Sequence, residues 1–279
     1  MSKCKVIAIS NQKGGVAKTT TAVNLGAYLN MKGKKVLLID FDPQGSLTTS
    51  LGFRNQDEME TTIKTMLEKT IRNIPFEKTD GIVQNSEGIK LIPANMELGV
   101  FEKSITSLIN REKILSEYIE KIKDDYDYII IDCQPSVEIL TINALTAADS
   151  VIIPVQTHYL SLKGMTQLLD TIDKIRVVLN PKLKIDGVLL TLANMQTRLA
   201  RSTVETLRNN YGSVLRVYKT IIPLGIKVAE CGIEGKSIFA YDKNCKVAMA
   251  YENFSREVLR DSERIKDGRT SECRWLVQI

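Results

Sequence analysis

The sequence predicts an α/β protein whose doubly wound, mostly parallel sheet is flanked by helices. Short apolar runs recur along the chain, and helical patterns lie between most of them. The first run leads through a glycine-containing turn into a helical stretch. Strands that are apolar on both faces are typical of a buried parallel sheet, which places ligands at the carboxyl ends of its strands.

The elements follow one another in a regular order. The first predicted strand covers residues 6–9, and a predicted helix over about 19–32 ends at Gly33, a common helix-terminating residue. The further predicted strands cover residues 36–40, 90–93, 128–132, 151–155, 187–192 and 219–222. Residues 55–89 are polar and weakly patterned, so we expect them to form an excursion over the surface.

The clearest predicted helix begins after Ser161, which we expect to be its N-cap. Its apolar stripe, which we expect to face the core, consists of Leu162, Met165, Leu168, Leu169, Ile172, Ile175 and Leu179.

Composition excludes several classes of site. His158 is the single histidine among 279 residues, so a multi-histidine metal site is excluded and a Ser-His-Asp triad is not expected. The five cysteines form no Cys-x-x-Cys pair, which argues against a zinc ribbon. No apolar run approaches the roughly 18 residues that a membrane helix needs, so we expect a cytoplasmic protein without a membrane partner.

A phosphate-binding loop is predicted directly after the first strand, at Asn11-Gln-Lys-Gly-Gly-Val-Ala-Lys-Thr-Thr20. Such a loop directs backbone N–H groups at phosphate oxygens, and the positive end of the following helix adds to the attraction. Lys18 is expected to neutralise the β- and γ-phosphates, and the Thr19 hydroxyl is expected to ligate Mg²⁺. Gln12 and Ala17 occupy the two glycine positions of the common G-x-x-x-x-G-K-[ST] pattern.

Lys13 and Ala17 are the two unusual residues of this loop. Lys13 is a second lysine beside one triphosphate, which indicates a cationic finger that reaches the nucleotide of a neighbouring subunit. The alternative is a solvated surface lysine. The Cβ of Ala17 is tolerable beside phosphate if the residue keeps a negative φ, and we expect ATP binding to survive.

Three aspartates lie at or just after the ends of apolar strands. Asp42 is placed to orient or deprotonate an attacking water, and Asp132 suits a carboxylate that holds Mg²⁺ through water. Asp40 is expected to lie behind Asp42 and Asp132 and to hold these two residues in position. Any one of these aspartates alone is equally well explained as the cap of a turn, so the catalytic interpretation depends on the loop.

The positive charge is concentrated in one stretch. The net charge is +5, and residues 194–227 hold six basic residues against the single acid Glu205, which accounts for the whole excess. Within it, Arg198, Arg201 and Arg208 share one face of a predicted helix, opposite Leu199, Val204, Leu207 and Tyr211. That face suits sequence-independent contact with DNA phosphates, although a solvated face with Arg–Glu pairs is the alternative.

The motifs together resemble the deviant Walker A ATPases of the ParA/Soj type, which segregate plasmids and chromosomes. The similarity runs from Ser2 to about Leu259 and includes the loop around Lys13 and residues 40–45, 126–136, 140–149, 153–155, 187–191 and 219–223. It implies a P-loop NTPase fold, with one ATPase domain over residues 1–262 and a C-terminal extension over 263–279.

The resemblance also implies roles for particular residues. The catalytic set is Lys13, Lys18 and Asp42, and the Mg²⁺ set is Thr19 and Asp132. The nucleotide-binding set is Lys13, Gly14, Gly15, Val16, Ala17, Lys18, Thr19, Thr20 and Pro223, the last bordering the adenine. The DNA-binding set is Arg198, Arg201, Arg208, Arg216 and Lys219.

The function implied is that of a slow, Mg²⁺-dependent ATPase. ATP would be sandwiched in a homodimer that binds DNA without sequence preference on the nucleoid, and a ParB-like centromere-binding partner would stimulate hydrolysis and release. Three alternatives stay open: a MinD-like membrane-positioning ATPase, an iron-protein-like reductase, and a DNA-coating protein that does not hydrolyse ATP.

Two stretches depart from the family pattern. Gln134 stands where relatives usually have proline, and we expect this change to loosen the segment after Asp132. Residues 224–231 lack the arginine near position 224 and the second Pro-Ser pair of relatives, so partner sensing is expected to differ.

Overall fold

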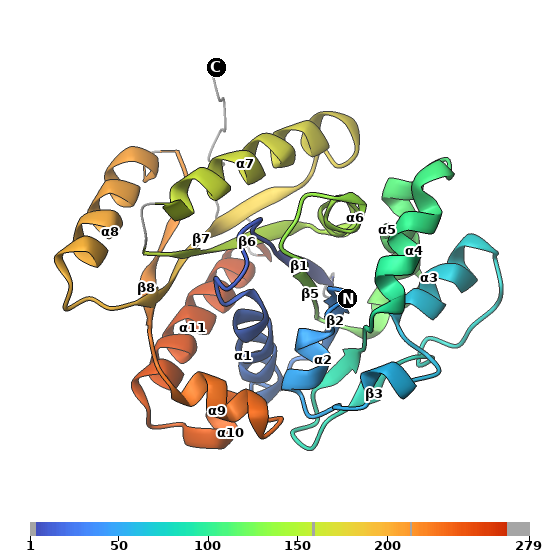
Figure 1. Ribbon diagram of the computed structural model, residues 1–279, viewed down its shortest axis with the longest axis horizontal. Helices are drawn as coiled ribbons and strands as arrows, with labels where there is room; N and C mark the ends of the chain where they lie inside the picture. The colour runs from blue at the N-terminus through green and yellow to red at the C-terminus, as the bar shows by residue number, and fades with distance from the viewer. Residues whose placement is uncertain (1–3, 158–159, 213, 267–279) are drawn as a thin grey trace.

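A computed structural model of the chain describes residues 4–157, 160–212 and 214–266. Its centre is an eight-stranded sheet in the order β3-β4-β2-β5-β1-β6-β7-β8. The strands are β1 (Lys5–Ile9), β2 (Val36–Phe41), β3 (Val83–Gln84), β4 (Lys90–Ile92), β5 (Tyr128–Cys133), β6 (Ser150–Gln156), β7 (Lys184–Ala193) and β8 (Val217–Pro223). Only the β3–β4 pair is antiparallel, so the predicted fold class and the predicted strands are confirmed (Figure 1).

Helices cover both faces of the sheet (Figure 1). On one face lie α3 (Ile63–Ile71), α4 (Glu97–Ser104), α5 (Ile114–Ile122), α6 (Ile139–Ala147), α7 (Leu160–Val178) and α8 (Arg198–Tyr211). On the other lie α1 (Lys18–Met31), α2 (Ser46–Ser50), α9 (Lys227–Ile233), α10 (Ile238–Asp242) and α11 (Lys246–Lys266). Strand side chains alternate between the two cores: Val6 and Ala8 face the first set, whereas Ile7 and Ile9 face the second.

Helix α1 packs closely on β2 because Gly26 has no side chain. A Cβ at this position would lie 2.7 Å from Leu38 Cδ2, so a larger residue would push the helix away from the sheet. Gly33 adopts φ 74° directly after the helix and its N–H bonds to the carbonyl of Asn30, which confirms the predicted helix end.

The N-cap expected for α7 is wrong. The helix begins at Leu160, so Ser161 already lies inside it. The apolar stripe is confirmed at Met165, Leu168, Ile172 and Ile175, which are buried, and at Leu169 and Leu179, which pack against them. The side chain of Leu162, His158 and the extension from residue 267 onward lie outside the described residues.

The surface excursion expected over residues 55–89 is wrong in its central part. The α3 helix packs Ile63, Met66 and Leu67 fully into the core. At its start, the Thr62 N–H donates to the Thr65 hydroxyl at 3.3 Å. Nine residues supply only about two and a half helical turns, too short a stretch for the apolar periodicity to stand out from its polar surroundings.

The carboxyl ends of β1, β2 and β5 lie side by side and carry the predicted site. Asp40 on β2 is the direct neighbour of Asp132 on β5, and Ile9 on β1 is the neighbour of Asp132 on its other side. The segment after β1 leads directly into α1. Within the described ranges, none of the helices combines the length and the apolar character needed to cross a membrane.

Candidate functional site

Lys18 is the first residue of α1, and its side chain is folded into the loop. Its Nζ donates a hydrogen bond to the backbone carbonyl of Lys13 at 3.2 Å, and the side chain is only 7% exposed. Burial lowers the pKa of Lys18, while the nearby carboxylate of Asp132 opposes that shift. A buried ammonium beside a helix N-terminus is a suitable neutralising group for phosphate oxygens.

Ala17 does not keep the negative φ on which its tolerance was expected to depend. The structure places Ala17 at φ 65° and ψ 35°, in the left-handed region, directly before α1. A residue with a Cβ costs about 1–2 kcal/mol more than glycine in this conformation. The loop therefore keeps a glycine-like backbone at a position where this chain has no glycine.

Thr19 and Asp132 meet across the gap between α1 and β5. The Thr19 hydroxyl donates to Asp132 Oδ2 at 2.7 Å, whereas the buried Asp132 Oδ1 has no hydrogen-bond partner in the described part of the chain. Burial raises the pKa of Asp132 well above its ordinary value, and the negative charge of Asp40 raises it further. A bound cation would satisfy the unpartnered oxygen and offset the burial of the carboxylate.

The donor set fits Mg²⁺ rather than a cation held entirely by protein. Among the described residues, no cluster of three or more His, Cys, Asp or Glu side chains is placed to hold a metal ion. One hydroxyl and one carboxylate are what Mg²⁺ commonly takes from a protein, because phosphate oxygens and water fill its other positions.

Asp40 and Asp42 differ sharply although they are two residues apart. Asp40 is fully buried and accepts hydrogen bonds from the Thr48 amide at 2.8 Å and the Thr48 hydroxyl at 2.7 Å. Burial raises the pKa of Asp40 to about 7. Asp42 is half-buried, and its carboxylate accepts the Gln44 amide at 2.9 Å. Asp42 thus has access to water, whereas Asp40 supports the turn behind it.

Gln134 does not leave the segment after β5 loose. Its side chain is buried, and Nε2 donates to Glu102 Oε1 on α4 at 3.0 Å. The same oxygen accepts the Leu140 amide in the first turn of α6 at 3.3 Å. The segment is therefore tied to two helices. Sequence reasoning missed Glu102, because no local signal marks an acid on α4 as a partner of position 134.

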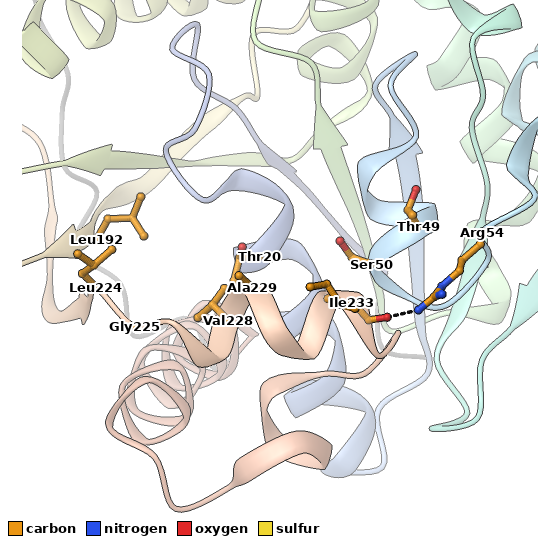
Figure 2. Close-up of a pocket in the computed structure, with 11 residues that line it drawn as sticks. Thr20, Thr49, Ser50, Arg54, Leu192, Leu224, Gly225, Val228, Ala229 and Ile233 are labelled. Carbon is orange, nitrogen blue, oxygen red and sulfur yellow. Dashed lines mark hydrogen bonds between the residues drawn. The ribbon is translucent and has the colours of Figure 1, made fainter.

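A groove of about 790 Å³ opens beside the loop, between α1, α2 and α9 (Figure 2). Its lining is Thr20, Thr49, Ser50, Arg54, Leu192, Leu224, Gly225, Val228, Ala229, Gly232 and Ile233. Arg54 closes one end by donating to the Ile233 carbonyl (Figure 2). Pro223 instead borders a second hollow of about 380 Å³ together with Met195, Ile221 and Met249.

The α8 helix presents Arg198, Arg201 and Arg208 to solvent. None of these arginines pairs with Glu205 or another acid in the described part of the chain, so the alternative of a face neutralised by Arg–Glu pairs is not seen. Arg201 donates to the Gln196 carbonyl and Arg208 to the Lys219 carbonyl. Of the apolar residues expected opposite the arginines, Val204 and Leu207 are buried, whereas Leu199 is 55% exposed.

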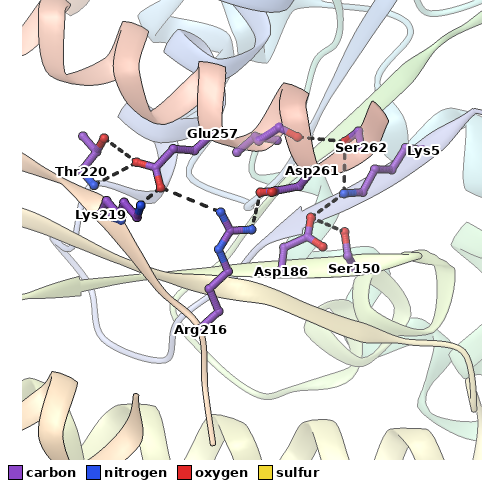
Figure 3. Close-up of polar contacts among 10 residues, drawn as sticks. Lys5, Ser150, Asp186, Arg216, Lys219, Thr220, Glu257, Asp261 and Ser262 are labelled. Atoms are coloured by element: carbon purple, nitrogen blue, oxygen red, sulfur yellow. Dashed lines mark hydrogen bonds and ion pairs between the residues drawn. The ribbon is translucent and has the colours of Figure 1, made fainter. Parts of the chain in front are cut away.

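Arg216 belongs to a different arrangement. It forms ion pairs with Asp261 and Glu257 of α11 (Figure 3). Its guanidinium also lies 4.6 Å from the centre of the Tyr218 ring. Lys227 likewise pairs with Asp242. Acids outside residues 194–227 therefore partly balance the positive charge of that stretch.

A buried strand, a phosphate loop and a helix, with acidic residues ending the neighbouring strands, define a P-loop nucleoside triphosphatase. A family model described as an AAA domain matches residues 4–185. The chain is 43% identical over 258 residues to the sporulation initiation inhibitor protein Soj of Bacillus subtilis (strain 168), covering 91% of this chain and 98% of the relative. The chain belongs to the Soj/ParA family of partitioning ATPases.

Further comparisons give a second partitioning relative and two solved structures of similar fold. The chromosome partitioning protein ParA of Caulobacter vibrioides is 39% identical over 264 residues, which are 93% of this chain and 96% of the relative. A Mycobacterium smegmatis structure described as cobyrinic acid a,c-diamide synthase with bound ADP and magnesium has a TM-score of 0.81 at 35% identity, covering 97% of this chain and 99% of that one. MinD from Pyrococcus horikoshii, at 21% identity and a TM-score of 0.72, shares the fold.

Proposed function

We propose that this protein is an ATP-dependent DNA-partitioning ATPase that acts in the cytoplasm on the nucleoid. The domain over residues 1–262 binds ATP and dimerises around it, and the dimer binds DNA without sequence preference. A ParB-like partner stimulates slow hydrolysis, which releases the protein from DNA. The unpartnered buried oxygen of Asp132 beside Thr19 and Lys18 is the observation that carries the proposal.

The nucleotide lies on residues 13–20. The loop amides and Lys18 would hold the phosphates, Thr19 and Asp132 would hold Mg²⁺, and the adenine would lie at the hollow that Pro223 borders. When bound, Mg²⁺ would neutralise charge that develops on the phosphoryl oxygens. Lys13 acts on the nucleotide of the partner subunit.

Asp42 positions the attacking water. Its half-buried carboxylate lies on the turn after β2, while the neighbouring Asp40 is held by Thr48 inside the fold. Asp42→Ala should retain ATP and accumulate as a DNA-bound dimer. Normal phosphate release by this variant would assign the water to another residue.

The basic face of α8 contacts DNA phosphates through Arg198, Arg201 and Arg208, and Lys219 extends it. Arg216 contributes less to binding, because Asp261 and Glu257 already balance its charge. Each phosphate that a basic side chain neutralises releases counterions, so the affinity depends on salt.

The test is DNA binding by the ATP-loaded protein over a range of salt concentrations. Replacing all three α8 arginines by alanine should weaken binding by roughly 10–1,000-fold and lower the salt slope by about 0.9 for each lost contact. ATP binding and dimerisation should be unchanged. As the matched control, Lys113→Ala removes a positive charge from η3 (Arg111–Lys113), far along the chain from α8. Equal losses in the control and the triple variant would contradict the α8 assignment.

A further inference from the structure

The edge strand β8 is not regular. Val217 pairs with Val188 and Ile221 pairs with Leu190, so the single residue between the partners on β7 faces three residues, 218–220, on β8. A bulge of this kind leaves backbone groups without partners in the sheet. The first bulged residue, Tyr218, is anchored by an edge-to-face contact with Phe254 of α11, with ring centres 4.9 Å apart.

One carboxylate accepts the backbone N–H groups of two of the three bulged residues (Figure 3). Glu257 of α11 accepts the amide of Lys219 at 3.0 Å, the amide of Thr220 at 2.9 Å and the hydroxyl of Thr220 at 2.6 Å. From the opposite helix layer, Arg208 of α8 donates to the carbonyl of Lys219 at 3.3 Å. Residue 219 is therefore held from α11 through its N–H and from α8 through its C=O.

The same helix also contacts the helix of the phosphate loop. Tyr251 of α11 lies 3.4 Å, hydroxyl to hydroxyl, from Thr21 in the first turn of α1. Arg256, directly before Glu257, donates to the Tyr28 hydroxyl near the end of α1. Contacts thus run from α1 through α11 and the bulge to Arg208.

We propose that Glu257 is a positioning residue for DNA binding. It does not touch DNA; it fixes the bulge so that Lys219 and Arg208 present their charges together. The inference rests on the proposed DNA-binding function. Arg216 lies 3.8 Å from the carboxylate and offsets its negative charge, so Glu257 can hold the bulge within a basic surface.

A charge-matched pair of variants separates the negative charge of Glu257 from its hydrogen bonds to the backbone of β8. Glu257→Gln and Glu257→Ala remove the same charge, but glutamine keeps an oxygen that accepts the hydrogen bonds of Thr220. Asp261→Asn is the control for charge, because the contacts of Asp261 are with Arg216 and not with the backbone of β8. For each ATP-loaded variant we would measure Kd for a short duplex over a series of salt concentrations, ATP affinity and thermal stability.

The glutamine variant and the Asp261→Asn control should bind DNA within about threefold of each other, whereas the alanine variant should bind about tenfold more weakly than the glutamine variant. In an Arg208→Ala, Lys219→Ala background, this tenfold difference should disappear. ATP affinity should be the same in all variants. Amide exchange at Thr220 should stay slow with glutamine and become fast with alanine, whereas the Lys219 amide loses its carboxylate acceptor in both variants.

Equal DNA affinity of the two Glu257 variants would overturn the positioning role while leaving the proposed function in place. Equal protection of the Thr220 amide in the two variants would overturn it as well. Absence of ATP-dependent DNA binding by the unmodified protein would overturn the proposed function together with this inference. A parallel fall in ATP affinity and thermal stability for alanine alone would assign Glu257 to general stability and overturn the inference.

Discussion

The two functional regions of this molecule are built in opposite ways. In the phosphate site, formed by Lys18, Thr19, Asp40 and Asp132, the charged groups are buried, and a hydrogen bond between Thr19 and Asp132 joins α1 to β5. In the basic edge, formed by α8, β8 and α11, charges are exposed, and Arg216 pairs with Asp261 of α11. A recognisable loop motif and the order of the parallel strands therefore define the first region, whereas the packing of α11 on β8 defines the second.

Removing the buried cation from the phosphate site should give the largest effect. Lys18→Ala should weaken ATP binding by about 100-fold or more, because a charge-assisted contact with phosphate is worth about 2–3 kcal/mol. Titration calorimetry with Mg·ATP measures this change. Lys32→Ala, at the exposed far end of α1, is the control and should bind ATP normally. Unchanged ATP affinity in Lys18→Ala would show that the buried lysine does not bind phosphate, and the contrast between a buried binding site and an exposed basic edge would be lost.

Most of the phosphate site was predictable from sequence because a contiguous loop motif and the order of the parallel strands fix its geometry. A strand, a loop and a helix occur in direct succession, and parallel strands bring Asp40 and Asp132 to the same edge of the sheet. The left-handed φ of Ala17 was not predictable, since side-chain type alone favours the other conformation.

The basic edge was predictable only in part. The spacing of Arg198, Arg201 and Arg208 gave their shared face correctly. The ion pairs of Arg216 and the role of Glu257 depend on how α11 crosses β8, and nothing in the local sequence encodes that crossing. The same reason explains why Glu102, the partner of Gln134 on another helix, was missed.

The raised pKa of Asp40 gives an intermediate effect that depends on pH. The folded protein holds this proton up to about pH 7, whereas the unfolded chain releases it near the ordinary value of 3.8. The stabilising contribution of the protonated carboxyl is therefore present at low pH and is lost as the pH rises through 7. Asp40→Asn does not titrate, so its stability relative to the unmodified protein should rise between pH 5 and pH 8 by roughly 2 kcal/mol.

Urea unfolding without nucleotide or Mg²⁺ measures this difference. Asp57→Asn, at an exposed aspartate on η1 (Gln56–Glu58), is the control for the substitution itself. A constant difference between Asp40→Asn and the unmodified protein across this pH range would show that the buried carboxyl is not held protonated. The distinction between a buried polar site and a solvated edge would then be weaker than the structure indicates.

The smallest expected effect concerns the backbone of the phosphate loop. Ala17→Gly should stabilise the protein by about 0.5–1 kcal/mol, because relief of the left-handed alanine exceeds the extra entropy that glycine gives the unfolded chain. Ala250→Gly, inside α11, is the matched control and should destabilise by about 1 kcal/mol, since helical alanine carries no such strain. Opposite signs in thermal unfolding would show that the loop holds its phosphate-binding backbone against the preference of its own residue. Destabilisation by both substitutions would mean that Ala17 is not strained.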